Sequence, residues 1–132
     1  MTARQTVETV PAELKAKEKT VSASEIRVHP SGRFVYSANR GHDTISVFSV
    51  DPDTGSLTLI EREPVRGATP RNFNLDPSGK WLLAAGQDSH TVAVFQVDSR
   101  TGELMYHGTN VSVPAPICIL FGPESDGEGR IR

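Results

Sequence analysis

The chain has 132 residues and a formal net charge of −2 at pH 7, with charged residues making up 23% of the sequence. Because both signs are interspersed, the charge gives no basis for binding nucleic acid or an anionic membrane, and we expect neither partner. No stretch approaches the roughly 18 apolar residues of a membrane span, and the first residues lack the apolar core of a signal peptide. The single cysteine, Cys118, excludes a disulfide within the chain, so we predict a cytoplasmic protein.

Short apolar runs separated by turn signals predict strands along most of the chain. Residues 5–10 resemble an outermost sheet strand, and residues 11–19 have helical propensity but are too short and polar to form a helix alone. The turn motifs are HPSGR, DPDTG, DPSGK and DSRTG. The strands expected between them lie at 26–29, 34–38, 45–50, 57–63, 73–76, 81–85, 92–97 and 104–108.

The second four strands repeat the first four. The motif HPSGR at 29–33 returns as DPSGK at 76–80, a spacing of 47 residues. Four-stranded antiparallel units of this length are typical of β-propeller blades, whereas a β-sandwich would need no such repetition. The sequence therefore predicts an all-β fold, a partial β-propeller. Its expected segments are the outer strand of a preceding blade with a linker (1–22), two blades (23–66 and 67–113), the first strand of a following blade (114–122) and a disordered tail (123–132).

The loops at one end of the predicted blades break the repeat. In an up-and-down blade the four turn motifs share one end, and the remaining loops share the other. At that second end Arg40 corresponds to Gln87, and Glu25 corresponds to Asn72. Repeats that keep their packing but diverge in the loops of one end are typical of a framework that carries a site there.

The polar residues of this end suggest a chemistry. Arg40 and Arg71 suit a carboxylate, a phosphate or a developing oxyanion, so we predict that they bind substrate. His42 is the candidate general base, and Glu25, beside the axis, would hold an arginine or activate water. The alternative is structural: the arginines would cap carbonyl groups or pair with acidic residues, and the histidines would hydrogen-bond within their loops. The further candidates for binding substrate oxygens are Gln87, Ser89 and His90.

Other motifs argue against metal sites and cofactors. The four histidines are dispersed, and no Cys-x-x-Cys pattern occurs. The segment from Asp51 to Gly55 resembles the start of a calcium loop, but it lacks the distal acid, so a hairpin turn is the better interpretation. We therefore expect no metal and no cofactor. Cys118 lies in the apolar run ICILF, which predicts a buried, inert thiol.

A family resemblance is carried by the polar loops. Residues 25–45 (EIRVHPSGRFVYSANRGHDTI) closely resemble a late blade of the propeller lactonases, and TPRNF at 69–73 with AAGQDSH at 84–90 resembles the next blade. This family includes propeller-type 6-phosphogluconolactonases and carboxymuconate cyclases. The resemblance covers about residues 5–121 and implies a seven-bladed, metal-free fold with its site at one end of the central channel. The matching site positions are Glu25, Arg40, His42, Arg71 and Gln87.

The resemblance also implies a reaction, the hydrolysis of 6-phospho-D-glucono-1,5-lactone in the pentose phosphate pathway. Arginines would hold the phosphate and stabilise the oxyanion, while His42 or Glu25 would activate water. Two alternatives stay open: a lyase of the carboxymuconate cyclase type, and a propeller-repeat module that binds partners without catalysis. Because a family member would carry about five more blades, we expect either a fragment that is inactive alone or several copies that close a ring.

Overall fold

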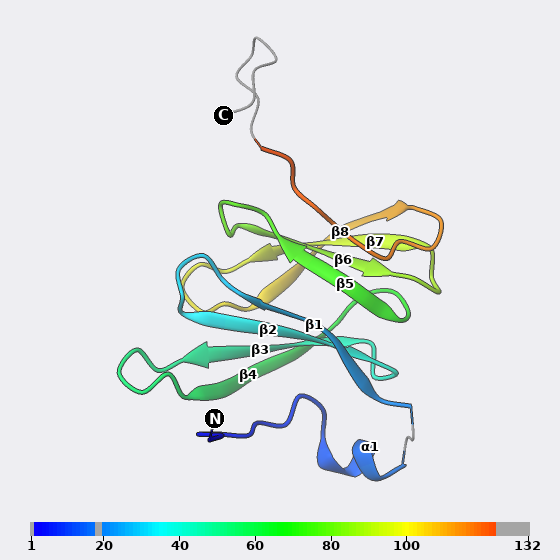
Figure 1. The fold of residues 1–132 in the computed structure, drawn as a ribbon. Coiled ribbons are helices and arrows are strands. Elements are labelled where there is room, and N and C mark those ends of the chain that lie inside the picture. The colour runs from blue at the N-terminus through cyan, green and yellow to red at the C-terminus, as the bar shows by residue number, and fades with distance from the viewer. Residues whose placement is uncertain (1, 18–19, 124–132) are drawn as a thin grey trace.

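Strands make up most of the computed structural model, which describes residues 2–17 and 20–123 (Figure 1). Within these residues one short helix, α1 (Ala12–Lys17), precedes eight strands. The strands are β1 (Ser22–Val28), β2 (Phe34–Arg40), β3 (Thr44–Val50), β4 (Leu57–Pro64), β5 (Pro70–Leu75), β6 (Trp81–Gly86), β7 (Thr91–Val97) and β8 (Leu104–Ser112).

The strands form two antiparallel sheets of four, in the orders β1-β2-β3-β4 and β5-β6-β7-β8. We call them the first and second blade. The predicted fold class is confirmed. The innermost strands are longer than expected, because β1 starts at Ser22 and β5 at Pro70. Their first residues are polar and carry no apolar pattern, so the sequence did not reveal them as strand.

Apolar side chains of both sheets fill the space between the blades, where β1 and β2 of the first blade lie against β5 of the second (Figure 1). β2 is buried along nearly its whole length. Both of its faces are covered, as expected of a strand in the middle of a stacked sheet. The buried cluster consists of Phe34, Tyr36, Ala38, Ile45, Val47, Val65, Phe73, Leu75, Leu82, Ala84, Ala93, Phe95, Val97 and Leu104.

Side chains of the first blade also hydrogen-bond the turns of the second. His29 donates from Nε2 to Gly79 O at 2.9 Å, and Tyr36 donates its hydroxyl to Gly102 O at 2.8 Å. Burial, with a smaller effect from the charge of Glu61, raises the pKa of Tyr36 far above its ordinary value. The hydroxyl therefore stays protonated and keeps donating at any pH at which the protein is handled.

A carboxylate makes the third such contact. Glu61 Oε1 accepts a hydrogen bond of 2.7 Å from Leu104 N, at the start of β8. Burial raises the pKa of Glu61. The bond from Leu104 acts against this shift, and the nearby charges of Glu63 and Glu103 add to it.

The hairpin turns of the two blades are built alike. Asp51 Oδ1 accepts from Thr54 N at 2.8 Å, and at the equivalent position Asp98 Oδ1 accepts from Thr101 N at 3.0 Å. These bonds hold the pKa of both carboxyl groups below the usual range. At Asp76, burial acts upwards, but the bonds from its turn outweigh it and the pKa is again lowered. The predicted hairpin turns are therefore observed.

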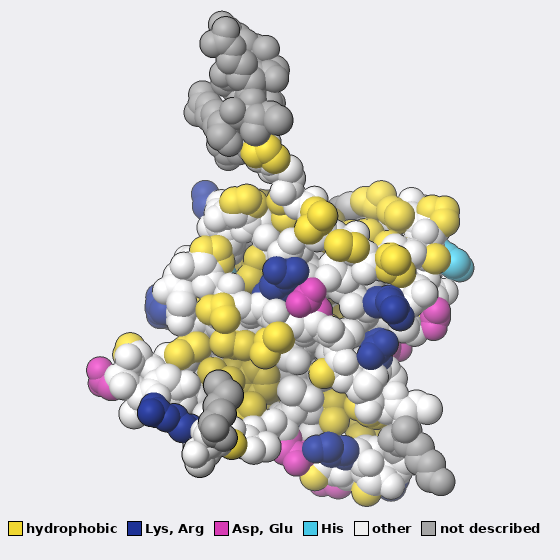
Figure 2. Space-filling model, viewed as in Figure 1, with side chains coloured by type: hydrophobic (Ala, Val, Ile, Leu, Met, Phe, Trp, Pro, Cys, Tyr) yellow, Lys and Arg dark blue, Asp and Glu magenta, His cyan; other side chains and the backbone are white. Residues whose placement is uncertain are grey.

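The face of the first blade that points away from the second is partly uncovered. Ile26 and Val28 of β1 are 64% and 62% exposed, whereas their repeat equivalents, Phe73 and Leu75 of β5, are 0% and 8% exposed. Figure 2 shows hydrophobic side chains gathered on the side of the molecule where β1 and β5 run. β5 thus buries these positions against the first blade, whereas β1 has no blade before it in this structure.

The N-terminal segment packs on the same face (Figure 1). The amide group of Gln5 bonds both Leu57 N, at 2.8 Å, and Leu57 O, at 2.9 Å, and Val10 is buried. The segment forms no strand within the described residues, because the ladder partners of an outer strand would come from a preceding blade. Its assignment to that blade stays a prediction. The carbonyl oxygen of Thr9 accepts hydrogen bonds from Asn39, Ser46 and Arg62.

The C-terminal segment, residues 113–123, is likewise irregular where a strand was predicted. It lies against β5, where Ile119 bonds Asn72 and Asn74. The prediction that Cys118 is buried is wrong: its side chain is exposed, because no further layer covers the segment. The predicted disordered tail lies, after residue 123, outside the described residues. No helix in the described part of the chain is long and apolar enough to cross a membrane.

The glycines of the repeated turns allow a matched test of blade packing. Gly55 and Gly102 occupy equivalent positions with φ of 73° and 79°, but a Cβ at 102 would lie 2.5 Å from Phe34 Cδ1, and one at 55 would meet nothing within 4 Å. We expect Gly55→Ala to cost about 1 kcal/mol from backbone strain. Gly102→Ala should cost about 1–3 kcal/mol more, because it overpacks the blade interface. Urea unfolding followed by Trp81 fluorescence measures both, and equal costs would contradict this account.

Glu61 gives a pH dependence whose sign follows from its raised pKa. The folded state binds the Glu61 proton more readily than the unfolded chain does. The contribution of Glu61 to the free energy of unfolding should therefore rise as the pH falls through the folded-state pKa towards the ordinary glutamate value of about 4.3. The lowered pKa values of Asp51, Asp76 and Asp98 act in the opposite direction, so the effect of Glu61 is the difference between the parent and a variant without its charge. Glu61→Gln keeps an acceptor for Leu104 N without the charge, so it should be more stable at pH 7 and lack this rise. Urea titrations between pH 7 and pH 4 of the parent and of Glu61→Gln test this, with Glu13→Gln in α1 as the control. A stability difference between the parent and Glu61→Gln that does not change with pH would refute it.

Candidate functional site

The loops that break the repeat meet at one end of the two blades, on the right in Figure 1. Thr69, in the linker between the blades, joins them. Its N–H donates to Asp43 Oδ1 at 3.0 Å, its hydroxyl donates to the Asp88 carboxylate, and its carbonyl accepts from Gln87 N at 3.1 Å. The loop between β2 and β3 is thus fastened to the loop between β6 and β7. The side chain of Gln87, half-buried beside Thr69, makes no hydrogen bond within the described residues.

Ser89 is used within the same loops. Its hydroxyl oxygen accepts from Ala68 N at 3.0 Å, donates to Gly86 O at 3.2 Å and lies 2.9 Å from Thr91 Oγ1. With these three contacts the hydroxyl holds the linker against the second blade. Ser89 thus has a structural role, which was the alternative to substrate binding for the polar loop residues. Its predicted role in binding substrate stays a prediction.

His90 and Asp43 are repeat equivalents that do the same local work. Both have a φ of 54°. The Asp43 carboxylate accepts from Thr69 N at 3.0 Å, and His90 Nδ1 accepts from Ala115 N at 2.9 Å. Their carbonyl groups accept from Val65 N and Val113 N. His90 therefore caps the backbone that follows β8, as Asp43 caps the linker that follows β4.

The imidazole ring of His42 is held through one of its two nitrogens. Its Nδ1 lies 2.8 Å from Thr44 Oγ1, and the fully buried Asn39 donates to the same hydroxyl at 3.1 Å. The other ring nitrogen, Nε2, has no hydrogen-bond partner within residues 2–17 and 20–123. A histidine held through one nitrogen in this way can exchange a proton through the other.

The two predicted arginines differ in their surroundings. Arg40 donates from Nη2 to Ala23 O at 3.3 Å, and its Nε is buried without a partner among the described residues. Arg71 is the extra residue of a β-bulge between Pro70 and Asn72 and is exposed, with no hydrogen bond or ion pair in the described part of the chain. Bulges redirect side chains near sites, so Arg71 is the arginine better placed to meet an anion.

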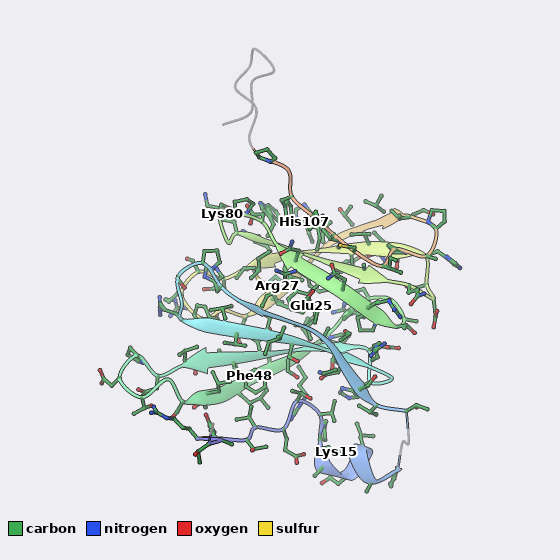
Figure 3. All side chains as sticks on the ribbon, in the orientation of Figure 1. Lys15, Glu25, Arg27, Phe48, Lys80 and His107 are labelled. Atoms are coloured by element: carbon green, nitrogen blue, oxygen red, sulfur yellow. The ribbon has the colours of Figure 1, made fainter. Side chains whose placement is uncertain are left out.

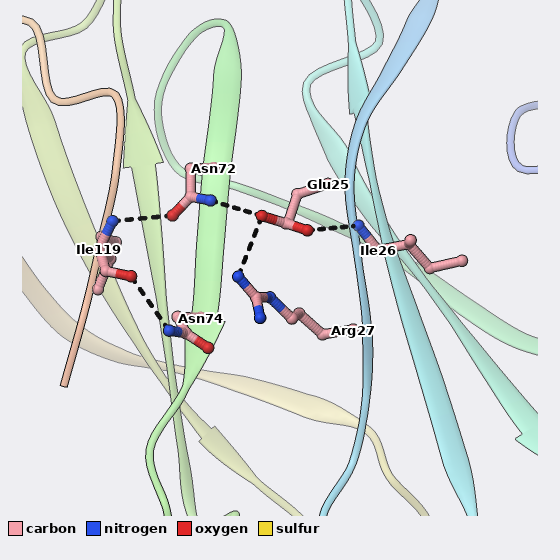
Figure 4. Close-up of polar contacts among 6 residues, drawn as sticks. All are labelled: Glu25, Ile26, Arg27, Asn72, Asn74 and Ile119. Atoms are coloured by element: carbon pink, nitrogen blue, oxygen red, sulfur yellow. Dashed lines mark hydrogen bonds and ion pairs between the residues drawn. The ribbon is translucent and has the colours of Figure 1, made fainter.

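Glu25 lies in a second bulge, that of β1, and is the most closely held of the predicted site residues (Figures 3 and 4). Its Oε1 accepts from Ile26 N at 3.1 Å, and its Oε2 accepts from Arg27 Nη2 at 3.3 Å and from Asn72 Nδ2 at 2.6 Å. Glu25 was expected to hold an arginine, and in the structure it pairs with Arg27. Neither Arg27 nor Asn72 was predicted to be part of the site, although Asn72 stands one repeat beyond Glu25.

The loop end of the blades thus offers an exposed guanidinium at Arg71 and an imidazole at His42. The oriented carboxylate of Glu25 lies further in, in the middle of the inner strand β1 and not at the loop end as predicted (Figure 3). No hydrogen bond or ion pair joins these three within the described residues. No enclosed pocket is found there in the described part of the molecule, and no group of three His, Cys, Asp or Glu side chains among those residues is arranged to hold a metal ion. The groups suit the binding of an anion and proton transfer.

The capping role of His90 can be measured directly. His90→Ala should speed hydrogen exchange of the Ala115 amide about fivefold, the effect of losing one hydrogen bond of about 1 kcal/mol. His90→Asp should restore the protection, because aspartate already serves at position 43. The Thr69 amide is the internal control and should exchange at its normal rate in both variants. Unchanged exchange at Ala115 in His90→Ala would rule the cap out.

Comparison with known proteins tests the resemblance seen in the loops. Residues 1–121 match the family described as "Lactonase, 7-bladed beta-propeller". The 6-phosphogluconolactonase of Bacillus subtilis is 38% identical over 98 residues, which are 74% of this chain and 28% of that protein. That of Formosa agariphila is 42% identical over 62 residues, 46% of this chain and 18% of that protein. The solved structure of a periplasmic gluconolactonase of Pseudomonas aeruginosa aligns with a TM-score of 0.78 and 34% identity, covering 85% of this chain and 30% of that one.

Two facts follow from these matches. The chain spans less than a third of the length of these relatives. The family match extends over nearly all of the described residues, including both blades and the loops at their end. The resemblance inferred from the loop motifs is confirmed, and the chain belongs to the seven-bladed β-propeller lactonase family.

Proposed function

We propose that this chain forms part of a lactone hydrolase whose substrate is a phosphorylated sugar lactone, 6-phosphogluconolactone. The observation that carries the proposal is the family match over both blades, together with relatives named 6-phosphogluconolactonase. The chemistry of the loop end supports it: a lactone that bears a phosphate needs a cation for binding and a base for water. The cytoplasmic location stays a prediction, because one solved relative is described as periplasmic.

The roles of the side chains follow from their surroundings. Arg71 is exposed on its bulge and would bind the phosphate or the oxyanion that forms when water attacks the lactone carbonyl. His42, with Nε2 without a partner in the described residues, is the better placed of the two candidate bases. Glu25 already accepts three hydrogen bonds, which suits a carboxylate that orients the site. Water attack would yield a ring-opened acid, with the proton passing through the base to the leaving alkoxide.

The rest of the site would come from further blades. The first blade leaves Ile26 and Val28 exposed where the second blade buries the equivalent residues, so its free face is built to receive a neighbouring blade. We expect the 132-residue chain by itself to leave the spontaneous hydrolysis of the lactone unchanged. Other propeller blades of the family are the partners that would complete the channel.

The test is a chimera in which residues 5–121 replace the matching segment of the Bacillus subtilis relative. A pH-stat assay should show hydrolysis of 6-phosphogluconolactone above the spontaneous rate, and Arg71→Ala should lower kcat/KM about 100-fold, the usual effect of losing one donor to an oxyanion or phosphate. The matched control is Arg100→Ala, an exposed arginine in a turn at the opposite end. A folded chimera no faster than the spontaneous reaction would refute the proposed function. An active chimera unaffected by Arg71→Ala would refute only the role of Arg71.

A further inference from the structure

A row of hydrogen bonds joins three neighbouring segments of the chain (Figure 4). Asn72 on β5 donates from Nδ2 to Glu25 Oε2 at 2.6 Å, and its Oδ1 accepts from Ile119 N at 2.9 Å. Asn74, two residues further along, donates to Ile119 O at 3.1 Å. The amide of Asn72 is thus held at both ends, with its donor side directed at the carboxylate of Glu25.

The row follows the period of the repeat. Glu25 and Asn72 lie 47 residues apart in the sequence, and Asn72 and Ile119 lie another 47 apart. Glu25 and Asn72, which hold the same position in successive blades, therefore lie side by side, and Ile119 extends the row in the segment predicted to open a following blade. The polar contact that orients Glu25 is consequently set by the way one blade follows another.

Asn72 controls the position of the Glu25 carboxylate more firmly than Arg27 does. Asn72 is 8% exposed, and it makes the shortest of the three hydrogen bonds to that carboxylate. The Arg27 side chain is 41% exposed, and its Nη2 lies 3.3 Å from Oε2. An ion pair that is so open to water contributes little, whereas a short, buried amide with two fixed partners has one orientation.

We propose that Asn72 is a positioning residue for Glu25 in the lactone-hydrolysing site, and that Ile119 fixes the orientation of its amide. This inference rests on the proposed function. Asn72 acts through Glu25 rather than on the substrate: it holds the carboxylate where it can direct the attacking water or a neighbouring cation. Misplacement of such a group by about 1 Å costs up to about 100-fold in rate, so its support affects turnover more than binding.

Two variants separate this role from a merely structural one. In Asn72→Leu the new side chain has nearly the same size as asparagine, but it cannot form the hydrogen bonds to Glu25 and Ile119. Asn74→Leu is the matched control, because Asn74 lies on the same strand and bonds Ile119 without touching Glu25. In the chimera, Asn72→Leu should lower kcat about 10–100-fold with KM changed less than about threefold. Asn74→Leu should leave kcat within about twofold of the parent.

A third variant adds a pH readout. Asn72→Asp places a second carboxylate beside Glu25, and two adjacent carboxylates share a proton. Uptake of that proton restores a donor to Glu25, so the activity of Asn72→Asp relative to the parent should rise as the pH is lowered from 8 to 6. A simple packing defect would give no such recovery.

The full 132-residue chain tests the link to Ile119 without any assay of activity. Asn72→Leu should speed hydrogen exchange of the Ile119 amide about fivefold, and unchanged exchange would refute the role of Ile119. In an active parent chimera, equal kcat for Asn72→Leu and Asn74→Leu would overturn the positioning role while the proposed function stands. An inactive parent would instead refute the proposed function, and with it the positioning role that rests on it.

Discussion

The structure depends on the way that one blade holds the next. Side chains of the first blade reach the backbone of the second at two turns and at the start of its outer strand, through His29, Tyr36 and Glu61. Each contact satisfies a buried or partly buried backbone group, which apolar packing alone would leave without a partner. The apolar cluster supplies the free energy of association, and these polar contacts fix the offset between the sheets. The relative position of Glu25 and Asn72 follows from that offset.

Much of this architecture could be predicted because the sequence repeats. The strands and turns were correct to within a few residues, since turn chemistry and apolar runs coincide in both copies. The starts of β1 and β5 were missed because their residues are polar and bulged. The flanking strands and the burial of Cys118 would depend on neighbouring blades that this structure does not include, so local pattern could not decide them.

The predicted site residues fall in two places. The divergence of the loops pointed to one end of the blades, where Arg40, His42, Arg71, Gln87, Ser89 and His90 lie, whereas Glu25 lies within the inner strand β1. Their role as a site stays a prediction. The sequence could not show that Ser89 is engaged in its own loop or that His90 repeats the work of Asp43. Both follow from backbone geometry, in particular the positive φ shared by Asp43 and His90. The contact between Asn72 and Glu25 was missed for a different reason: their correspondence was taken as divergence, although the period also makes the two residues neighbours.

The contacts between the blades also bear on how a complete ring could form. At the positions of His29, Tyr36 and Glu61 the second blade carries Asp76, Leu83 and Gly108. An ionised Asp76 and Leu83 have no side-chain donor for a turn carbonyl, and Gly108 has no side chain to accept from a strand N–H. A ring made from copies of this chain would lack all three hydrogen bonds at every junction between copies. The outer face of the second blade is thus suited to a neighbour of different sequence, as expected when each blade of a propeller has its own partner.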